Sequence, residues 1–493
     1  MTPTLNLKTI FGIKLKQRRE RRHLTLAQLG QASSLSASYL AEIEAGKKYP
    51  KAEKIWQIAE VLGCTYDDLV STRLGHEFTE LQQFLSSPGV RDFPFDLFGV
   101  PAADLMKLLA QSPHEVAALI RTVGDLAREH NIGVEHFLHA ALRCYQELTG
   151  NYYEAIEEKA EAFRSALSPE RRGLVSFDAL VGHLRAECGC AVDEHALAAG
   201  PALRQFRAVR AASPPRLLLN PALTVSQRAF VVAREIGYHA LDLKRRSFTT
   251  PPHREGSFEQ VLNDFKASYF AGAVLLPRGR LVTDLRAFFR LPTWQAEALL
   301  RLLDRHQVTA ETLMYRLSQL VPSQFGLRVH FLKFTDQGGQ FQLVKQLNLS
   351  DLPVPPGIGA AEHYCRRWLS TRLLVEAAAW HGRRARHPRS PLVGAQRSRF
   401  PDGKEFFCMG LAQPQPLQPD ITTSLTLGFT VDQKVRDTVR FAHDRTIPEA
   451  VINGTCERCP FDASECADRV APPTLHLKSQ ARDQRERELN SLL

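Results

Sequence analysis

Residues 23–50 decide the fold of the amino-terminal region, and they read HLTLAQLGQASSLSASYLAEIEAGKKYP. Thr25 is followed three residues later by Gln28, which predicts a capping box at the start of one short helix. Ser36 is a favourable N-cap for a second helix. Residues 30–35 lie between the two helices and are predicted to form a turn. The stretch therefore predicts two short helices joined by a tight turn.

The second predicted helix has two different faces. Leu40 and Ile43 fall on one face at helical spacing, and Gly46 ends the helix where a left-handed residue is favoured. The other face is small and unobstructed, and it carries Ala37, Ser38, Ala41 and Ala45. Basic residues flank the helix pair on both sides, which predicts contacts with phosphates. They are Lys14, Lys16, Arg18, Arg19, Arg21, Arg22, Lys47, Lys48 and Lys51.

Helical patterns continue on the carboxy-terminal side of this stretch. Residues 55–62 repeat apolar side chains at helical spacing, and Thr65 with Asp68 caps a further short element. Residues 1–72 as a whole resemble the five-helix XRE (Cro/repressor-like) DNA-binding domain. The alternative interpretation is a generic small helical bundle with a solvated basic face.

The resemblance implies double-stranded DNA as the partner of this domain. The residues expected to contact DNA are Gln28, Ser36, Ala37, Ser38, Tyr39, Lys47 and Lys48. One such unit reads a single half-site, so we expect a homodimer. The outer face of the second helix offers no Arg, Asn or Gln for a bidentate base contact. DNA shape and phosphate contacts are therefore expected to matter more than direct readout.

The length and charge of the chain indicate several domains and an anionic partner. At 493 residues, a prior of about 150 residues per domain suggests three or four domains. The formal net charge is +10, from 63 basic and 53 acidic residues. No long apolar run and no signal-peptide pattern is present, so we expect a cytoplasmic protein without a membrane partner. Nine cysteines are too few for a secreted disulfide framework.

Residues 73–168 are predicted to form a helical linker or dimerisation region. Apolar side chains recur there at helical intervals, at Leu105, Leu108, Leu109, Ile120, Phe137, Leu138 and Leu142. Residues 152–167 read YYEAIEEKAEAFRSAL, an acidic amphipathic helix suited to linking or dimer contacts. We interpret His136, His139 and Cys144 as core or surface residues, because no carboxylate or second cysteine completes a metal site.

Residues 169–290 mix the helix and strand periods and predict an α+β domain. Residues 216–219, RLLL, indicate a buried strand, and a helix is expected from Thr224. The stretches TVSQRAFVVAREIGYHAL and ASYFAGAVLLP resemble the ImmA/IrrE-like peptidase domain, a relative of the zincins. In that family one helix carries His-Glu-x-x-His, since histidines four residues apart share a face and bind Zn²⁺ while the glutamate serves as base.

This zinc motif is broken in the present chain. Arg234 and Tyr238 stand at the two histidine positions, and only the glutamate, Glu235, remains. His239 is one residue late, which turns it about 100° around the helix and off the metal face. We therefore predict a zincin-like fold without catalytic residues, and so a protein that is not an enzyme.

The third metal ligand of that family is an acidic residue on the next helix. By the resemblance this position falls on Lys266, although Asp264 lies close to it. Arg234 and Lys266 would keep a positive centre that suits a phosphate, carboxylate or nucleotide-bearing effector. The alternative is that both are ordinary salt-bridging residues. For the whole chain, the alternative function is an ImmA-like metallopeptidase fused to a repressor domain.

The rest of the chain divides into a connector, a terminal domain and a tail. Residues 291–350 predict helices followed by a hairpin. Residues 352–359, LPVPPGIG, predict a linker into a small α+β domain at 351–477, which is expected to hold a cysteine-bound metal or cluster. Residues 478–493 predict a solvated, mixed-charge helical tail.

Three cysteines lie close together in this terminal domain. Cys456 and Cys459 form a Cys-x₂-Cys pair, and Cys466 follows seven residues later. Such thiols predict a zinc site or an iron–sulfur cluster, and the spacing alone does not choose between them. Three unligated structural thiols are the alternative. The fourth ligand must come from elsewhere in the chain, and the candidates are Cys365, Cys408 and His443.

The order of these features resembles one family over nearly the full chain. An XRE-type unit, a zincin-like middle and a terminal Gly-x-Cys-x-x-Cys…Cys-x-x-Arg-x-x-Pro-Pro string together resemble the short-chain fatty acyl regulators, which include the propionate (methylcitrate-cycle) and glyoxylate-cycle regulators. The resemblance implies a transcriptional regulator with acyl-CoA esters as effectors. It also implies a [4Fe–4S] cluster on Cys365, Cys456, Cys459 and Cys466. A zinc-stapled regulator without iron is the alternative.

Overall fold

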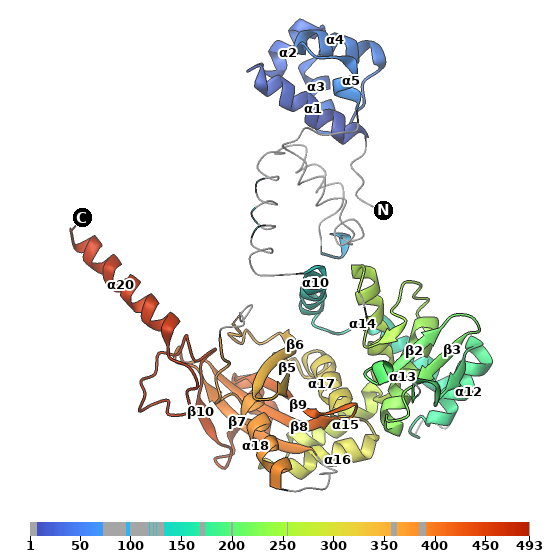
Figure 1. Cartoon of the computed structure of the whole chain (residues 1–493), viewed down its shortest axis with the longest axis vertical. Helices are drawn as coiled ribbons and strands as arrows, with labels where there is room; N and C mark the ends of the chain where they lie inside the picture. Colours follow the sequence, from blue (N-terminus) through green and yellow to red (C-terminus); the bar gives the residue numbers. More distant parts are fainter. Residues whose placement is uncertain are drawn as a thin grey trace. The chain divides into compact units, whose positions relative to one another are not determined.

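The computed structural model divides the chain into two compact units (Figure 1). One unit is Met1–Leu142 with Glu255–Leu262, and the other is Arg143–Arg254 with Asn263–Leu493. The structure describes residues 7–71, 95–98, 118, 122, 125, 133–167, 173–198, 201–253, 255–355, 362–383 and 391–492. The predicted apolar positions Leu105, Leu108, Leu109 and Ile120 lie outside these residues.

Five helices form the amino-terminal domain of the first unit, as the XRE resemblance implies. They are α1 (Leu7–Arg21), α2 (Leu26–Ser33), α3 (Ala37–Glu44), α4 (Ala52–Leu62) and α5 (Tyr66–Val70). One apolar cluster joins all five helices, and it contains Phe11, Leu15, Leu29, Leu40, Ile43, Ile55, Ile58, Ala59, Leu62 and Leu69. The predicted helical stripes are therefore confirmed as the core of this domain.

The predicted caps are also present. The Thr25 hydroxyl accepts from the Gln28 amide N–H, and the Gln28 side chain accepts from the Thr25 N–H at 2.8 Å. Ser36 caps α3, and Gly46 follows that helix with a φ of 70°. The predicted turn at residues 30–35 was too long, because α2 continues to Ser33. Gly30 instead allows close packing, since a Cβ there would lie 2.6 Å from the Leu35 carbonyl oxygen.

The amino-terminal part of the second unit contains a small mixed sheet. Its strands are β1 (Ala191–Asp193), β2 (Ala208–Ala211), β3 (Arg216–Leu219) and β4 (Thr249–Thr250), in the order β1-β3-β2-β4. The helices of this region are α10 (Val134–Leu148), α11 (Glu154–Leu167), α12 (Phe177–Cys188), α13 (Val225–Ala240) and α14 (Phe258–Leu275). Both α10 and α14 begin in residues of the first unit. The strand predicted at 216–219 and the helix predicted from Thr224 are both confirmed.

Helix α11 belongs to the core of the second unit, although its sequence suggests a linker. Glu157 on α11 receives two hydrogen bonds from Arg316 on α17 (Ala310–Phe325), at 2.6 and 2.7 Å. The Tyr269 hydroxyl donates a third, at 2.7 Å. Arg316 and Glu157 are 1% and 2% exposed. A buried pair of this kind is satisfied only when both partners are present.

A six-stranded sheet forms the carboxy-terminal half of this unit. Its strands are β5 (Val329–Gln337), β6 (Gln340–Asn348), β7 (Leu392–Arg399), β8 (Glu405–Gln415), β9 (Gln418–Thr430) and β10 (Glu449–Val451), in the order β10-β7-β8-β9-β5-β6. The further helices are α15 (Arg278–Phe289), α16 (Ala296–His306), α18 (Leu369–Arg383), α19 (Gln433–Thr438) and α20 (Thr474–Leu492). Short 3₁₀ turns occur at Phe95–Phe98, Ala196–Ala198, Pro201–Leu203 and Arg440–His443.

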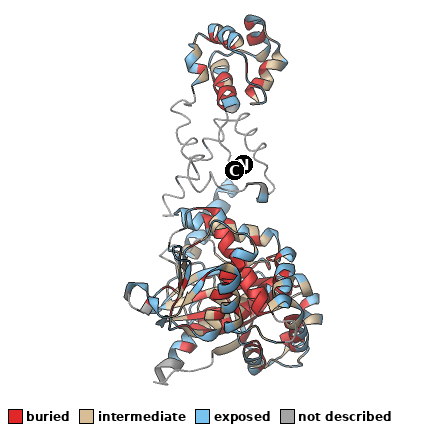
Figure 2. Cartoon of the chain, turned by 90° about the vertical axis from the view of Figure 1, so that its right-hand side faces the viewer, coloured by how far each residue is buried: buried red, intermediate tan, exposed pale blue. Residues whose placement is uncertain are grey.

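Helices cover both faces of the six-stranded sheet. Phe407 and Met409 of β8 point into a core shared with α15, α16 and α17. Phe406 and Cys408, the alternate residues, point into a second core shared with α18. Figure 2 shows buried residues concentrated inside this unit. No helix in the described part of the chain is long and apolar enough to span a membrane.

The hairpin expected in a separate connector is part of this sheet. β5 pairs with β6 and also with β9, from Val329 opposite Phe429 to Asp336 opposite Thr422. The hairpin itself is confirmed, but the predicted boundary near residue 351 divides one sheet into two. The reason is that β5 and β9, the strands on the two sides of the proline-rich residues 352–359, still pair in one sheet.

Candidate functional site

The outer face of α3 is available to a partner. Ser38 is exposed, and Ala37 and Ala41 are half-buried. Gln28 and Ser36 are also exposed, but their acceptor oxygens already cap α2 and α3. These two side chains therefore have mainly N–H and O–H donors left for DNA.

Several of the predicted phosphate-binding residues have other partners. Lys14 is 6% exposed, and its ammonium donates to the Asp68 carbonyl at 3.0 Å and to Ser71 at 2.6 Å. Arg19 forms a bidentate pair with Glu44, at 2.7 and 2.9 Å. For these two residues the predicted phosphate role was wrong, because they tie α1 to α5 and α3. A basic sequence run does not reveal which charges are used inside the domain.

Two lysines sit beside the Tyr39 ring on α3. The Lys54 ammonium lies 4.3 Å from the ring centroid and the Lys48 ammonium 5.7 Å. Lys48 is also paired with Glu42 at 2.6 Å. Lys54 comes from α4 and was missed in the sequence, because no local spacing links it to Tyr39. A cation held over an aromatic ring next to the recognition face can contact a phosphate.

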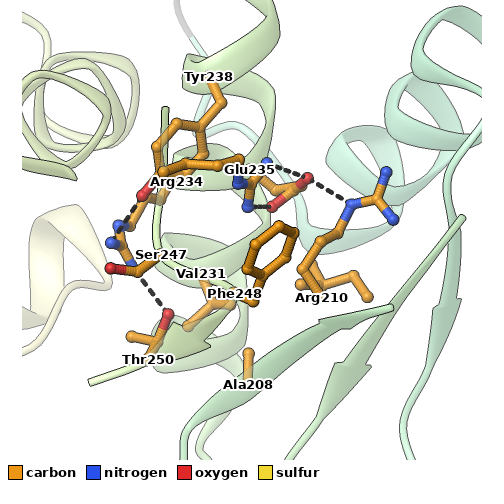
Figure 3. A pocket seen from close by; sticks show the side chains of 11 residues that line it. Ala208, Arg210, Val231, Arg234, Glu235, Tyr238, Ser247, Phe248 and Thr250 are labelled. Carbon is orange, nitrogen blue, oxygen red and sulfur yellow. Dashed lines mark hydrogen bonds and ion pairs between the residues drawn. The ribbon is translucent and has the colours of Figure 1, made fainter. Parts of the chain in front are cut away.

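In the second unit, the two broken-motif positions on α13 form a hydrogen-bonded chain (Figure 3). Arg234 donates to the Thr250 hydroxyl at 2.5 Å and to the Tyr238 hydroxyl at 2.7 Å. Tyr238 in turn donates to Asp264 Oδ1 at 2.5 Å. Asp264 also lies 3.5 Å from the Arg234 guanidinium and accepts from Ser247. This network fills the place where two histidines would hold a metal.

Glu235, the remaining motif residue, is held by two arginines. Arg210 donates to it at 2.9 Å and Arg246 at 2.7 Å, and Arg246 makes a second contact with the other carboxylate oxygen. Burial would raise the pKa of Glu235, but hydrogen bonds from His239 and Arg246 and the charges of Arg246 and Arg210 lower it to about 2. A carboxylate this acidic is a poor general base near neutral pH.

Lys266 does not lie in this site. It is half-buried, and burial lowers its pKa. The side chain that reaches Tyr238 is Asp264, which lies two residues before Lys266 on α14. The prediction that Lys266 occupies this position is therefore wrong. The cavity beside Arg234 has a volume of about 10 Å³, which holds roughly one water molecule. In this conformation it has no room for a nucleotide.

Glu235 gives the second unit a pH-dependent stability. Its folded pKa, about 2, is below its ordinary value of 4.5, so its stabilising effect is present above pH 4.5 and is lost as the pH falls toward 2. We expect urea unfolding at stepped pH values to show this loss in the wild type, of up to about 3 kcal/mol. Glu235→Gln should be less stable at pH 7 and should lack this part of the pH slope. Equal slopes in the two proteins would contradict the assignment.

The four predicted cysteines lie in one buried site of the carboxy-terminal half. Tyr364 and Thr455 form an isolated β-bridge. The Cys365 N–H donates to the Gly454 carbonyl at 3.2 Å, and the Cys456 N–H donates to the His363 carbonyl at 2.8 Å. The exposed fractions of the four thiol residues are 6%, 4%, 2% and 7%, for Cys365, Cys456, Cys459 and Cys466.

The thiols are close enough to influence one another. Burial raises the pKa of Cys365, and Cys456 and Cys459 raise it further. Burial, followed by Cys459, raises the pKa of Cys466 to about 11. Of the other fourth-ligand candidates, Cys408 lies on β8 beside His330, at 3.7 Å, and His443 is exposed at the end of a 3₁₀ turn. Cys408 and His443 therefore lie on elements other than the segments that carry the four cysteines, and the ligand set itself stays a prediction.

Charged pairs join the two segments that carry these cysteines. Arg458 contacts Glu362 through two bonds of 2.8 Å, and Arg367 lies 2.7 Å from Asp468. The Glu457 carboxylate lies 2.8 Å from His363 Nδ1. The backbone carbonyl of Glu457 accepts hydrogen bonds from the Leu475 and His476 N–H groups at the start of α20. The cysteine loop therefore anchors the terminal helix.

The residues present fit a cysteine-ligated group. Four buried thiols are the donor set of a Cys₄ site. Within the described ranges, no three histidine, cysteine or acidic side chains are placed to hold a single metal ion.

Comparisons with known proteins identify two parts of the chain. Residues 15–69 match the family described as Helix-turn-helix, and residues 195–318 match the IrrE N-terminal-like domain. The second match begins and ends later than the predicted 169–290 and reaches into α17.

A solved structure of a Mycobacterium tuberculosis transcriptional regulator is 20% identical, with a TM-score of 0.47, and the match covers 68% of this chain and 94% of that chain. No curated protein matches the chain. The chain thus combines a DNA-binding helix-turn-helix domain with an IrrE-like domain.

Proposed function

We propose that this protein is a homodimeric transcriptional regulator whose carboxy-terminal half senses a metabolite. The observation that carries the proposal is the recognition helix α3, which is capped by Ser36 and presents Ser38 to solvent in a domain that matches helix-turn-helix proteins. Two copies are needed because one helix-turn-helix unit reads one half-site. Dimer spacing and phosphate contacts then supply selectivity that the small side chains of α3 do not.

The IrrE-like domain serves in this proposal as a scaffold without peptidase activity. Arg234 and Tyr238 replace two zinc ligands and are bonded to each other. The Glu235 carboxylate forms ion pairs with Arg210 and Arg246. The proposal that this protein is not an enzyme rests on these contacts. The competing function, a metallopeptidase fused to a repressor domain, would require both networks to be rearranged before a metal and a base were available.

The cysteine site is proposed to hold a [4Fe–4S] cluster on Cys365, Cys456, Cys459 and Cys466. When bound, such a cluster supplies a centre that accepts and releases one electron. The chain's own contribution is to exclude water around the thiols and to hold the loop through Arg458 and Arg367. Zinc in the same site is the second candidate, since four thiolates suit either group.

Acyl-CoA esters are proposed as effectors on the resemblance to short-chain fatty acyl regulators. A small carboxylate or phosphate near Arg234 would suit the positive charge there. The cavity of about 10 Å³ must open for this to happen. Phe248 lines the cavity and is 60% exposed, so it is the side chain best placed to move.

One preparation of the full chain tests these proposals together. We expect protein purified without oxygen to contain iron and sulfide and to absorb near roughly 400 nm. DNA binding to the fragment upstream of its own gene is expected to change with propionyl-CoA and not with CoA alone. A colourless protein with one zinc per chain would favour the zinc-stapled alternative. Zinc-dependent cleavage of a repressor substrate would overturn the non-enzymatic proposal.

Two substitutions near α3 separate phosphate contacts from base recognition. We expect Lys47→Ala to weaken binding to all DNA sequences alike and to reduce the slope of log affinity against log salt by about 1, since one phosphate contact is lost. Ser38→Ala should leave discrimination between operator and unrelated DNA intact. Fluorescence anisotropy at stepped salt concentrations measures both. Lys404→Ala, at an exposed position between β7 and β8, is the control. A large, base-specific loss for Ser38→Ala would contradict the prediction.

A further inference from the structure

Four arginines surround the cysteine site, and three of them have clear partners. Arg367 pairs with Asp468, and Arg458 pairs with Glu362. Arg366 stacks over the Phe341 ring, with its guanidinium carbon 3.9 Å from the ring centroid. The positive charges of Arg367 and Arg458 are therefore balanced by carboxylates. The fourth arginine, Arg469, is different.

Arg469 directs its guanidinium at the cysteines. Its Nη2 lies 3.7 Å from Cys459 Sγ and also donates to the Phe461 carbonyl. The positive charge of Arg469 interacts electrostatically with the thiols of Cys459 and Cys466. The nearby carboxylate is Asp462, which accepts from Ser464 and Glu465, and these hydrogen bonds together with the charge of Arg469 lower its pKa. No ion pair joins Asp462 to Arg469 in the described part of the chain.

A cation beside ligand sulfurs has a defined electrostatic effect. Net charge and hydrogen bonds to the sulfurs are two of the features that set the reduction potential of an iron–sulfur cluster. A [4Fe–4S]²⁺ core with four thiolates carries −2, and one electron makes it −3. No bond forms or breaks, and Arg469 stays protonated because guanidinium groups do not titrate in proteins. A nearby positive charge stabilises the −3 state more than the −2 state.

We propose that Arg469 tunes the reduction potential of the cysteine-bound cluster and raises it toward values at which the cluster is reduced. The inference rests on the proposed function, because it requires the four cysteines to hold a cluster. Arg469 is a positioning and charge-supplying residue and does not ligate iron. Its distinguishing feature is the contact of its guanidinium with the Cys459 sulfur.

The test compares the full chain with three variants, each loaded anaerobically with ferrous iron and sulfide. Dithionite is the electron donor, and absorbance near roughly 400 nm follows reduction at known potentials. We expect Arg469→Gln to lower the reduced-to-oxidised ratio at least tenfold at a fixed potential, a shift of about 59 mV to more negative values for a one-electron couple. Arg469→Lys should keep most of the wild-type potential, because it keeps the charge.

The control is Lys404→Gln, which removes an exposed positive charge between β7 and β8 and should not shift the potential. If Arg469→Gln does not assemble a cluster, Arg469→Met takes its place, because it also removes the charge. An unchanged potential in the loaded charge-removing variant, or an equal shift in the control, would overturn the role of Arg469 alone. A wild-type protein that takes up zinc and no iron would overturn the cluster itself, and the proposal with it.

Discussion

Exchanging Arg234 and Tyr238 together for histidine is expected to give a protein that binds one more zinc ion per chain than the wild type. The two positions lie one helical turn apart on α13, and the Tyr238 hydroxyl is already 2.5 Å from Asp264. Histidines there, with the Asp264 carboxylate, reproduce a three-ligand catalytic zinc arrangement. The double exchange also removes the cation that now pairs with Asp264 at 3.5 Å.

Zinc content after dialysis, measured by mass spectrometry, checks this expectation. Adding Asp264→Asn to the double variant should abolish binding, and either single exchange should bind far more weakly. The zinc-loaded double variant is expected to remain without peptidase activity, because Arg210 and Arg246 still hold Glu235. Failure of the double variant to bind zinc while it remains folded would show that the α13 and α14 side chains do not share a metal position.

Replacing Cys365 by serine is expected to abolish assembly of the proposed cluster, with loss of both iron and the absorbance near roughly 400 nm. Cys365 is the proposed ligand farthest in sequence from the other three, so without it the loop of Cys456, Cys459 and Cys466 cannot complete a four-thiolate site. Iron and sulfide analysis of anaerobically purified protein provides the measurement.

Cys408→Ser is the matched control for this experiment. Cys408 is as buried as Cys365, at 6% exposure, and was an equal candidate for the fourth ligand in the sequence. It faces His330 on the sheet, where burial raises its pKa to about 12. We expect Cys408→Ser to retain iron. If it loses iron while Cys365→Ser keeps it, the fourth ligand has been assigned to the wrong cysteine.

The amino-terminal domain could be predicted well because its signals are local. The capping pairs Thr25–Gln28 and Thr65–Asp68 are three residues apart, and each determines where a helix begins. The partners of charged side chains can instead lie far away in the sequence. Lys14 reaches Ser71, 57 residues away, so the sequence did not reveal that this lysine is used inside the fold.

The IrrE-like site could be predicted only in part. Loss of the two histidines is visible along α13, whereas the choice between Asp264 and Lys266 depends on how α14 is rotated against α13. Arg210 and Arg246 were missed, because β2 and the segment before β4 approach Glu235 only after folding. The cysteine grouping followed from a family resemblance, since the residues alone left Cys365, Cys408 and His443 as equal candidates.

The buried pair of Glu157 and Arg316 decides where this protein can be divided. A fragment that begins at residue 169, as the sequence pattern suggests, would leave the Arg316 guanidinium inside the folded body without its carboxylate. Removing one partner of such a pair costs about 3–5 kcal/mol, a large part of the stability of a typical domain. Isolated fragments of the second unit should therefore start before α11, at or before residue 143. The stretch resembling a linker is thus a permanent part of the second unit.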